Sequence, residues 1–156
     1  MDYFFDETQQ MIVETAREIT REKILPIRAE LDEQNQFPRE ILYDIAKADL
    51  FGIFVPEEYG GLGGGCYEIV LAMEELARGC VGVATSYAAS ALGIFPVILA
   101  GSEEQKEKYL PDIATGSRWA AFGLTEANAG SDASGIRTTE VEDGDSWILN
   151  GTKQWI

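Results

Sequence analysis

The most informative stretch of the sequence is GLTEANAGSDASG, which runs from Gly123 to Gly135. An apolar start gives way to small residues that carry hydroxyl, carboxylate and amide groups. Loops of this composition let backbone N–H groups and hydroxyls approach a ligand closely. The stretch contains neither a nucleophile–base pair nor a metal-ligand cluster. It therefore predicts binding of a polar, flat or phosphorylated ligand rather than acid–base chemistry, and an ordinary Ser-, Asp- and Gly-rich loop is the alternative.

Extended segments are predicted around this loop, at residues 119–124, 136–141, 147–149 and 153–156. Asp143-Gly144 and Asn150-Gly151 are turn signals between such segments. The sequence ends at Ile156, inside the last of these predicted strands. A sheet cut there would expose an edge, so we expect the chain to be a fragment.

Helices are predicted before this region. Apolar residues recur at helical spacing within residues 11–23, 41–48 and 69–77, while residues 84–99 are apolar on nearly all faces and predict a buried helix. Pro26 is expected to bend or restart the first helix, and Ser102 is expected to cap a short helix at 103–110. The fold class is thus α+β: an amino-terminal all-α helical domain at 1–117, then an incomplete antiparallel β domain at 118–156.

A glycine-dense stretch, GGLGGG, lies between Gly60 and Gly65. It does not fit a phosphate cradle, because no Lys-Ser or Lys-Thr pair follows and no strand-to-helix setting surrounds it. We expect a flexible connector.

Composition excludes several classes of function. The formal net charge of -15 argues against nucleic-acid binding and against anionic membrane surfaces. The chain has no histidine, and its two cysteines form no CxxC motif, so zinc and other His-based metal sites and Ser-His-Asp catalysis are excluded within it. No apolar run is expected to span a membrane, and no secretory leader is recognised, so a cytoplasmic location is predicted.

The stretch at 123–135 resembles the first signature of the acyl-CoA dehydrogenase family: Gly-Leu-Thr-Glu, two free positions, small-Gly-Ser-Asp, two more, then Gly. All its fixed positions are matched. Further segments that are similar to the family lie at 57–61, 101–110 and 149–156. The resemblance covers essentially the whole chain, and it implies an FAD-dependent enzyme.

The resemblance also implies roles for individual residues in binding the cofactor. Phe122 and Leu124 match positions that touch the flavin ring, and Thr125 matches a hydroxyl near its reactive nitrogen. Gly130 and Ser131 match positions near the flavin phosphates and the CoA arm, Ser131 thus serving the substrate as well. Trp155 matches a residue that flanks the ring system, with Ile156 beside it. A residue of a hairpin core is the alternative for Trp155.

Glu126 is not assigned as a base, since a carboxylate beside a turn is usually solvated or capping. The resemblance also implies that the buried helix forms part of the acyl pocket, and on this helix Thr85, Ala88, Ala89 and Leu92 share one face by their spacing. Close packing of this face against another helix is the alternative.

The implied reaction is α,β-dehydrogenation of an acyl-CoA to the trans-2-enoyl-CoA. The catalytic base is expected in a missing carboxy-terminal domain, so this chain alone is predicted to be inactive. Electron-transferring flavoprotein and assembly into a homotetramer are expected from the resemblance. A flavin-dependent acyl-CoA oxidase or monooxygenase of the same fold, or a non-catalytic truncated interaction module, are the alternatives.

Overall fold

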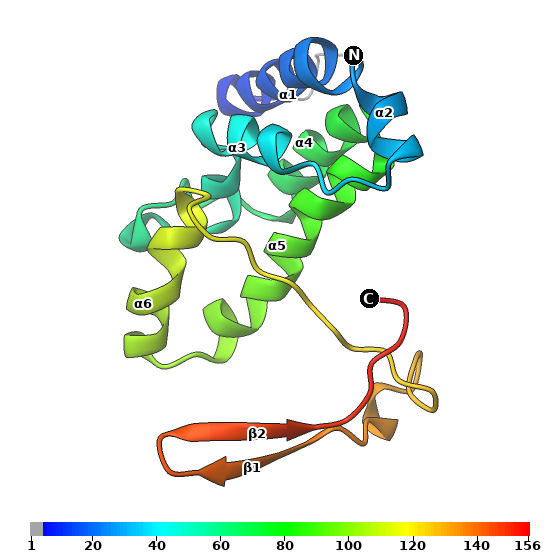
Figure 1. Cartoon of the computed structure of the whole chain (residues 1–156). Coiled ribbons are helices and arrows are strands. Elements are labelled where there is room, and N and C mark those ends of the chain that lie inside the picture. The colour runs from blue at the N-terminus through cyan, green and yellow to red at the C-terminus, as the bar shows by residue number, and fades with distance from the viewer. Residues whose placement is uncertain (1–4) are drawn as a thin grey trace. The chain divides into compact units, whose positions relative to one another are not determined.

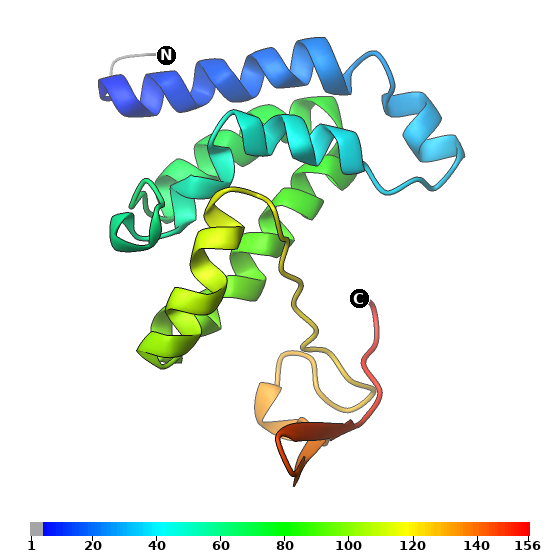
Figure 2. The same cartoon turned by 60° about the vertical axis from the view of Figure 1, so that its left-hand side comes forward.

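The contacts of the chain divide it after Ala121 into two compact units, which we call the helical unit and the hairpin unit. The computed structural model describes residues 5–156, and each unit is described by itself (Figure 1; Figure 2). The division lies slightly beyond the domain boundary that the sequence predicts after residue 117. Trp119 explains the difference, because its ring packs against Phe37 and Tyr43 at centroid distances of 5.6 and 5.2 Å.

The helical unit consists of helices and short helical turns. These are α1 (Glu7–Ile19), a π-helical turn (Thr20–Ile24), α2 (Arg28–Glu33), α3 (Arg39–Lys47), 3₁₀ turns at Leu50–Phe54 and Glu57–Tyr59, α4 (Cys66–Gly79), α5 (Val81–Ala100) and α6 (Glu103–Ala114). Helix α4 packs against both α1 and α5 (Figure 1). The predicted order, helices first and an antiparallel β segment after them, is confirmed.

Local signals set the ends of the first helix. Asp6 and Gln9 form a capping box, in which Asp6 Oδ1 accepts from Gln9 N at 2.8 Å and Gln9 Oε1 accepts from Asp6 N at 3.2 Å. The helical path ends just before Pro26, as predicted, and α2 begins at Arg28. The buried face includes Val13, whereas Met11, the first apolar residue of the predicted range 11–23, is exposed.

A buried carboxylate joins α4 to α1. The Glu75 side chain is only 6% exposed, yet its oxygens accept from Arg17 Nη2 at 3.0 Å and Arg17 Nε at 3.2 Å, and pair with Arg78 Nη1 at 3.2 Å. The Thr20 hydroxyl donates to the Glu75 carbonyl at 2.9 Å. Two guanidinium groups thus compensate a charge that would otherwise be costly to bury.

The glycine stretch is a closely packed loop, so the expectation of a flexible connector is wrong. A Cβ on Gly61 would lie 1.9 Å from the Val55 carbonyl oxygen, which leaves room only for glycine. Leu62 N donates to Gly52 O at 2.7 Å, and Gly63 N donates to Val55 O at 3.0 Å. Because these N–H groups already have protein partners, they are not free to hold a phosphate.

Helix α5 buries one face only, which corrects the expectation that it is covered all round. Its buried residues are Val83, Ala84, Tyr87, Ser90, Ala91 and Ile94. The Tyr87 hydroxyl donates to Leu50 O at 2.9 Å, and its ring lies edge-on to Phe51 at 5.4 Å. Leu92 and Leu99 on the other faces are exposed.

Helix α5 also bears on the membrane question. Within residues 5–156 it is long and apolar enough to cross a membrane, contrary to the expectation from the sequence, because its glycine and polar residues do not interrupt the helix. A single such helix is weak evidence, since core helices of soluble proteins meet the same criteria.

The hairpin unit contains a two-stranded antiparallel sheet of β1 (Thr139–Asp143) and β2 (Ser146–Asn150), paired from Thr139 with Asn150 to Asp143 with Ser146. The predicted turn at Asp143-Gly144 is confirmed, and Gly144 has a φ of +60°. Residues 119–124 and 153–156 were expected to be strands, but neither segment forms one. Strands need paired neighbours, whereas residues 153–156 make one backbone hydrogen bond within the described hairpin unit, from Gln154 N to Thr125 O at 2.8 Å.

Candidate functional site

The stretch at residues 123–135, which we call the signature loop, lies in the hairpin unit and is held in shape by short-range hydrogen bonds. Glu126 N donates to Ala129 O at 2.9 Å and Ala129 N donates to Glu126 O at 3.1 Å, which closes a tight turn. Asp132 then caps a 3₁₀ turn at Ala133–Gly135, because its Oδ1 accepts from the Ser134 N–H at 3.2 Å and from the Ser134 hydroxyl. The polar residues that suggested ligand binding thus also hold the loop in shape.

The Glu126 carboxylate ties this loop to both ends of the hairpin. It accepts from Lys153 Nζ at 2.8 Å, from Arg137 N at 2.7 Å, and from both the Thr138 N–H at 3.1 Å and the Thr138 hydroxyl. Its side chain is 8% exposed, so the expectation of a solvated or capping carboxylate is wrong. We call Glu126, Arg137, Thr138 and Lys153 the Glu126 cluster.

This cluster changes the acidity of the carboxylate. Hydrogen bonds from Lys153, from the Thr138 hydroxyl and from Arg137 N lower the pKa of Glu126 to about 2. A carboxylate with such a pKa stays ionised at neutral pH and accepts a proton poorly. Glu126 therefore acts as a structural anchor in the hairpin unit, and its exclusion as the base stays a prediction.

The structure brings the two predicted flavin segments together. Leu124 O accepts from Lys153 Nζ at 3.0 Å, and Thr125 O accepts from Gln154 N at 2.8 Å. A Cβ on Gly123 would lie 3.7 Å from Ile156 Cδ1, in ordinary contact. Residues near 124 and near 155, far apart in the sequence, thus lie side by side within the hairpin unit.

The side chains of these segments differ in burial. Phe122, Leu124 and Thr125 are half-buried, whereas the Trp155 ring is 91% exposed on a backbone with a φ of +60°. Within the described hairpin unit, Trp155 is therefore not a core residue, and the alternative that the sequence left open is not realised there.

The two loop residues assigned to phosphates and CoA lie on the surface. Gly130 and Ser131 are exposed, and a Cβ on Gly130 would meet nothing within 4 Å. Packing among the described residues therefore does not demand glycine at this position.

The residues assigned to the acyl pocket lie in the helical unit on α5. Thr85 is exposed, Ala88 and Ala89 are half-buried, and Leu92 is 51% exposed. These residues lie off the buried face of the helix. The alternative was that this face packs closely against another helix. Thr85 and Leu92 are exposed, so in the described helical unit no helix packs over them.

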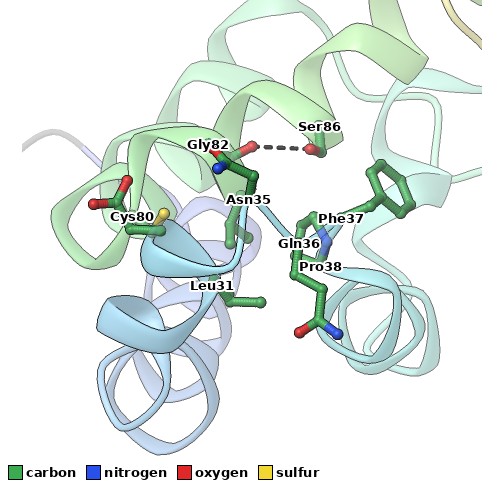
Figure 3. Close-up of a pocket in the computed structure, with 10 residues that line it drawn as sticks. Leu31, Asn35, Gln36, Phe37, Pro38, Cys80, Gly82 and Ser86 are labelled. Carbon is green, nitrogen blue, oxygen red and sulfur yellow. Dashed lines mark hydrogen bonds between the residues drawn. The ribbon is translucent and has the colours of Figure 1, made fainter.

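A cavity of about 420 Å³ opens elsewhere on the helical unit, between the segment joining α2 to α3 and the start of α5 (Figure 3). Leu31, Phe37, Cys80 and Ser86 are among the residues that line it. Ser86 Oγ donates to Gly82 O at 2.9 Å, so this hydroxyl already has a partner in the helix. None of the residues that the sequence predicted for the site lines this cavity.

Lys153 and Thr138 were not predicted as site residues, although their hydrogen bonds to Glu126 hold the two predicted flavin segments in place. The available signal was weak: a lysine in an apolar terminal segment and an acidic residue in the signature. Only the fold shows that they meet. Among residues 5–156, no group of three or more His, Cys, Asp or Glu side chains could hold a metal ion.

Comparisons with known proteins cover both units. Residues 6–117 match the family model described as acyl-CoA dehydrogenase, N-terminal domain, and residues 121–156 match the model of the middle domain. A Bacillus subtilis (strain 168) protein named "Probable acyl-CoA dehydrogenase" is 39% identical over 100% of this chain and 41% of its own length. The CarC subunit of the caffeyl-CoA reductase–Etf complex of Acetobacterium woodii is 45% identical over 98% of this chain and 41% of its own.

Solved structures give the same picture. A crystal structure of an acyl-CoA dehydrogenase complexed with FAD, from Bacillus anthracis, is 39% identical with a TM-score of 0.87, over 97% of this chain and 27% of that chain. The chain thus spans about two fifths of the length of the curated relatives it matches.

Proposed function

Because this chain belongs to the acyl-CoA dehydrogenase family, we propose that it forms the amino-terminal helical domain and the beginning of the middle β domain of an FAD-dependent enzyme that oxidises an acyl-CoA to the trans-2-enoyl-CoA. The observation that carries the proposal is the pairing of the signature segment with the Trp155 segment, through Thr125 O and Gln154 N. It supports the proposal because it brings the backbone of Thr125 beside Gln154, the neighbour of Trp155, within the hairpin unit.

The residues present fit a flavin. Trp155 offers an exposed aromatic side chain. Thr125 offers a hydroxyl, and its carbonyl accepts a hydrogen bond from the N–H of Gln154, the residue before Trp155. The open space around Gly130, next to the Ser131 hydroxyl, suits the close approach of a phosphate. Phe122, Leu124, Thr125, Trp155 and Ile156 would contact the ring, and Gly130 and Ser131 the phosphates.

FAD, when bound, supplies the hydride acceptor. The role of this chain would be to bind and orient the flavin. The Thr125 hydroxyl would donate a hydrogen bond near the reactive nitrogen of the ring, and the apolar Phe122 and Leu124 would shield the ring from water. Thr85, Ala88 and Leu92 would line the acyl group, with Ser131 near the CoA arm. Glu126 keeps the Lys153 end of the site in place and does not accept the substrate proton.

The proposal is tested on the full-length protein. We expect a bound flavin whose visible absorption bleaches anaerobically on addition of acyl-CoA, with enoyl-CoA formed. The isolated 156-residue chain is expected to give no enoyl-CoA, because the catalytic base is expected outside it. A full-length protein without flavin, or with a flavin that a panel of acyl-CoA thioesters leaves oxidised, would contradict the proposal.

A second candidate function uses the same site for the reverse reaction, the reduction of an enoyl-CoA. The relative from Acetobacterium woodii is named a subunit of a caffeyl-CoA reductase–Etf complex, so the same chain could serve reduction of an enoyl-CoA. Adding enoyl-CoA to the reduced full-length protein and acyl-CoA to the oxidised full-length protein, in separate experiments, compares the two directions. An oxygen-dependent turnover without any protein acceptor would instead indicate the oxidase of the same fold.

Partners and location are also part of the proposal. An electron-transferring flavoprotein as acceptor is supported by the name of that relative and suits a chain with a net charge of -15 if the docking surface of the acceptor is basic. A homotetramer is proposed from the family resemblance. A cytoplasmic location suits the two free cysteines, Cys66 and Cys80.

A further inference from the structure

Gly93 marks the place where another segment of the helical unit crosses α5 in backbone contact. A Cβ on Gly93 would lie 2.7 Å from Ala121 O, 2.8 Å from Ala121 N and 2.9 Å from Ala120 Cβ. Cβ atoms essentially never come so close to other atoms, and two of these three atoms are backbone. Only glycine lets residues 120 and 121 lie against the helix at this point.

The same crossing segment, residues 118–121, is held from its other end by an aromatic cluster. Trp119 packs on Phe37 and Tyr43, and the Arg39 guanidinium lies 5.3 Å from the Trp119 ring centroid. Ser90 Oγ lies 3.4 Å from Ala120 O, on the same side of α5 as the crossing. The Trp119 Nε1 atom is buried and has no hydrogen-bond partner among the described residues, so packing rather than hydrogen bonding keeps the ring there.

The two residues that meet at this crossing, Gly93 and Ala121, are sequence neighbours of predicted site residues, one of the acyl pocket and one of the flavin segment. Gly93 directly follows Leu92, which is assigned to the acyl pocket. Ala121 directly precedes Phe122, which is assigned to the flavin. Covalent geometry therefore ties the start of the flavin segment to the spot on α5 where residue 121 is held.

We infer that Gly93 and Trp119 are positioning residues of the proposed reaction: they hold residues 120 and 121 against α5 and so fix where the flavin segment begins relative to the acyl helix. This inference rests on the proposed function. Hydride transfer requires near-contact alignment of the reacting atoms, and a misplacement of about 1 Å can cost roughly 100-fold in rate. A side chain at 93 must displace the crossing segment by a comparable amount.

The glycine has a plainer explanation, which predicts the opposite outcome. If residue 93 were only a helical position, alanine would improve it, because glycine is a poor helix former. Gly82 provides the matched control in the same helix, since a Cβ there meets only Cys80 Sγ at 3.7 Å, an ordinary contact. The two Gly→Ala changes are chemically identical, and only Gly93 carries the crossing; Gly82 lies in the first turn of α5, so helix propensity alone predicts at least as much stabilisation by alanine at Gly93.

The experiment compares Gly93→Ala with Gly82→Ala in the flavin-loaded full-length protein. We measure the rate of flavin reduction at saturating acyl-CoA in a single turnover, the dissociation constant of acyl-CoA, the flavin circular dichroism and the melting temperature. For Gly93→Ala we expect the reduction rate to fall roughly 10- to 100-fold and the flavin dichroism to change, with helix content retained. Gly82→Ala should match the wild type.

Three outcomes separate the possibilities. A Gly93→Ala protein that reduces its flavin as fast as Gly82→Ala overturns the inference and leaves the proposed function standing. A wild-type protein whose flavin is not reduced by acyl-CoA overturns the proposed function itself. If Gly93→Ala does not fold, Trp119→Leu and Trp119→Phe decide: a slow Leu variant rescued by Phe supports positioning, and equal rates in both and in the wild type overturn it.

Discussion

The helical unit and the hairpin unit are held together by different forces. The helical unit has a continuous apolar core that includes Phe51, Leu76 and Tyr87. In the hairpin unit all residues of β1 and β2 are exposed, and Ala129 and Glu126 are its buried residues. Burial of apolar surface therefore stabilises the first unit, whereas hydrogen bonds and one ion pair organise the second.

The two units should therefore tolerate different substitutions. Loss of packed volume should matter in the helical unit and little in the hairpin unit. Loss of the Glu126 carboxylate should matter in the hairpin unit, because no apolar core there replaces its hydrogen bonds.

The largest effect is expected from Phe51→Ala, which would empty part of the core around Tyr87. We expect a loss of about 3–5 kcal/mol in the free energy of unfolding of the helices, measured by urea titration of helical circular dichroism. Trp147→Ala, an equally drastic truncation at a side chain that is 63% exposed on β2, is the control and should change it by less than about 0.5 kcal/mol. Equal losses would contradict the division into two kinds of unit.

Glu126→Gln should disrupt the hairpin unit without affecting the helices. The substitution removes the charge that holds Lys153, and it leaves an amide among the Arg137 N–H, Thr138 N–H and Lys153 donors. We expect faster hydrogen exchange at the amides of Gln154 and Thr138, with an unchanged helical melting curve. Glu140→Gln, on the exposed face of β1, should leave both unchanged.

Acid should destabilise the hairpin unit over a defined pH range. The pKa of Glu126 is lowered from 4.5 to about 2 by its donors, so between these values the folded hairpin unit binds fewer protons than the unfolded one. The contribution of Glu126 to the stability of the hairpin unit is therefore fully present above about pH 4.5 and is lost progressively as the pH falls to about 2. NMR titration of the Glu126 carboxyl measures this, and a midpoint near 4.5 would show that the cluster does not persist in solution.

The smallest effect is expected from Gly144→Ala in the hairpin turn. With a φ of +60°, any Cβ is disfavoured there by about 1 kcal/mol, although nothing lies within 4 Å of it. The cross-strand contacts of β1 and β2 should weaken in NOE spectra, and the Glu126 cluster should survive. If those contacts vanish together with the cluster, the turn rather than the carboxylate organises the unit.

Local patterns predicted much of the fold. The start of α6 follows from its capping residue Ser102, and the hairpin follows from Asp143-Gly144. Strands were wrongly predicted at 119–124 and 153–156, since an apolar run shows the capacity to pair and not the presence of a partner. The flavin and acyl roles of the candidate site stay predictions, although the structure does bring Thr125 and Gln154 together.

The sequence by itself determined the family, the order of helices before the hairpin and the identity of the signature loop, because these depend on spacing along the chain. Only the tertiary structure decided that Glu75 and Glu126 are buried with cationic partners, that the glycine stretch is packed, and that Gly93 carries a crossing segment. Each of these depends on two segments distant in sequence approaching to within contact. No local pattern encodes that distance, since it is fixed by how the whole unit packs.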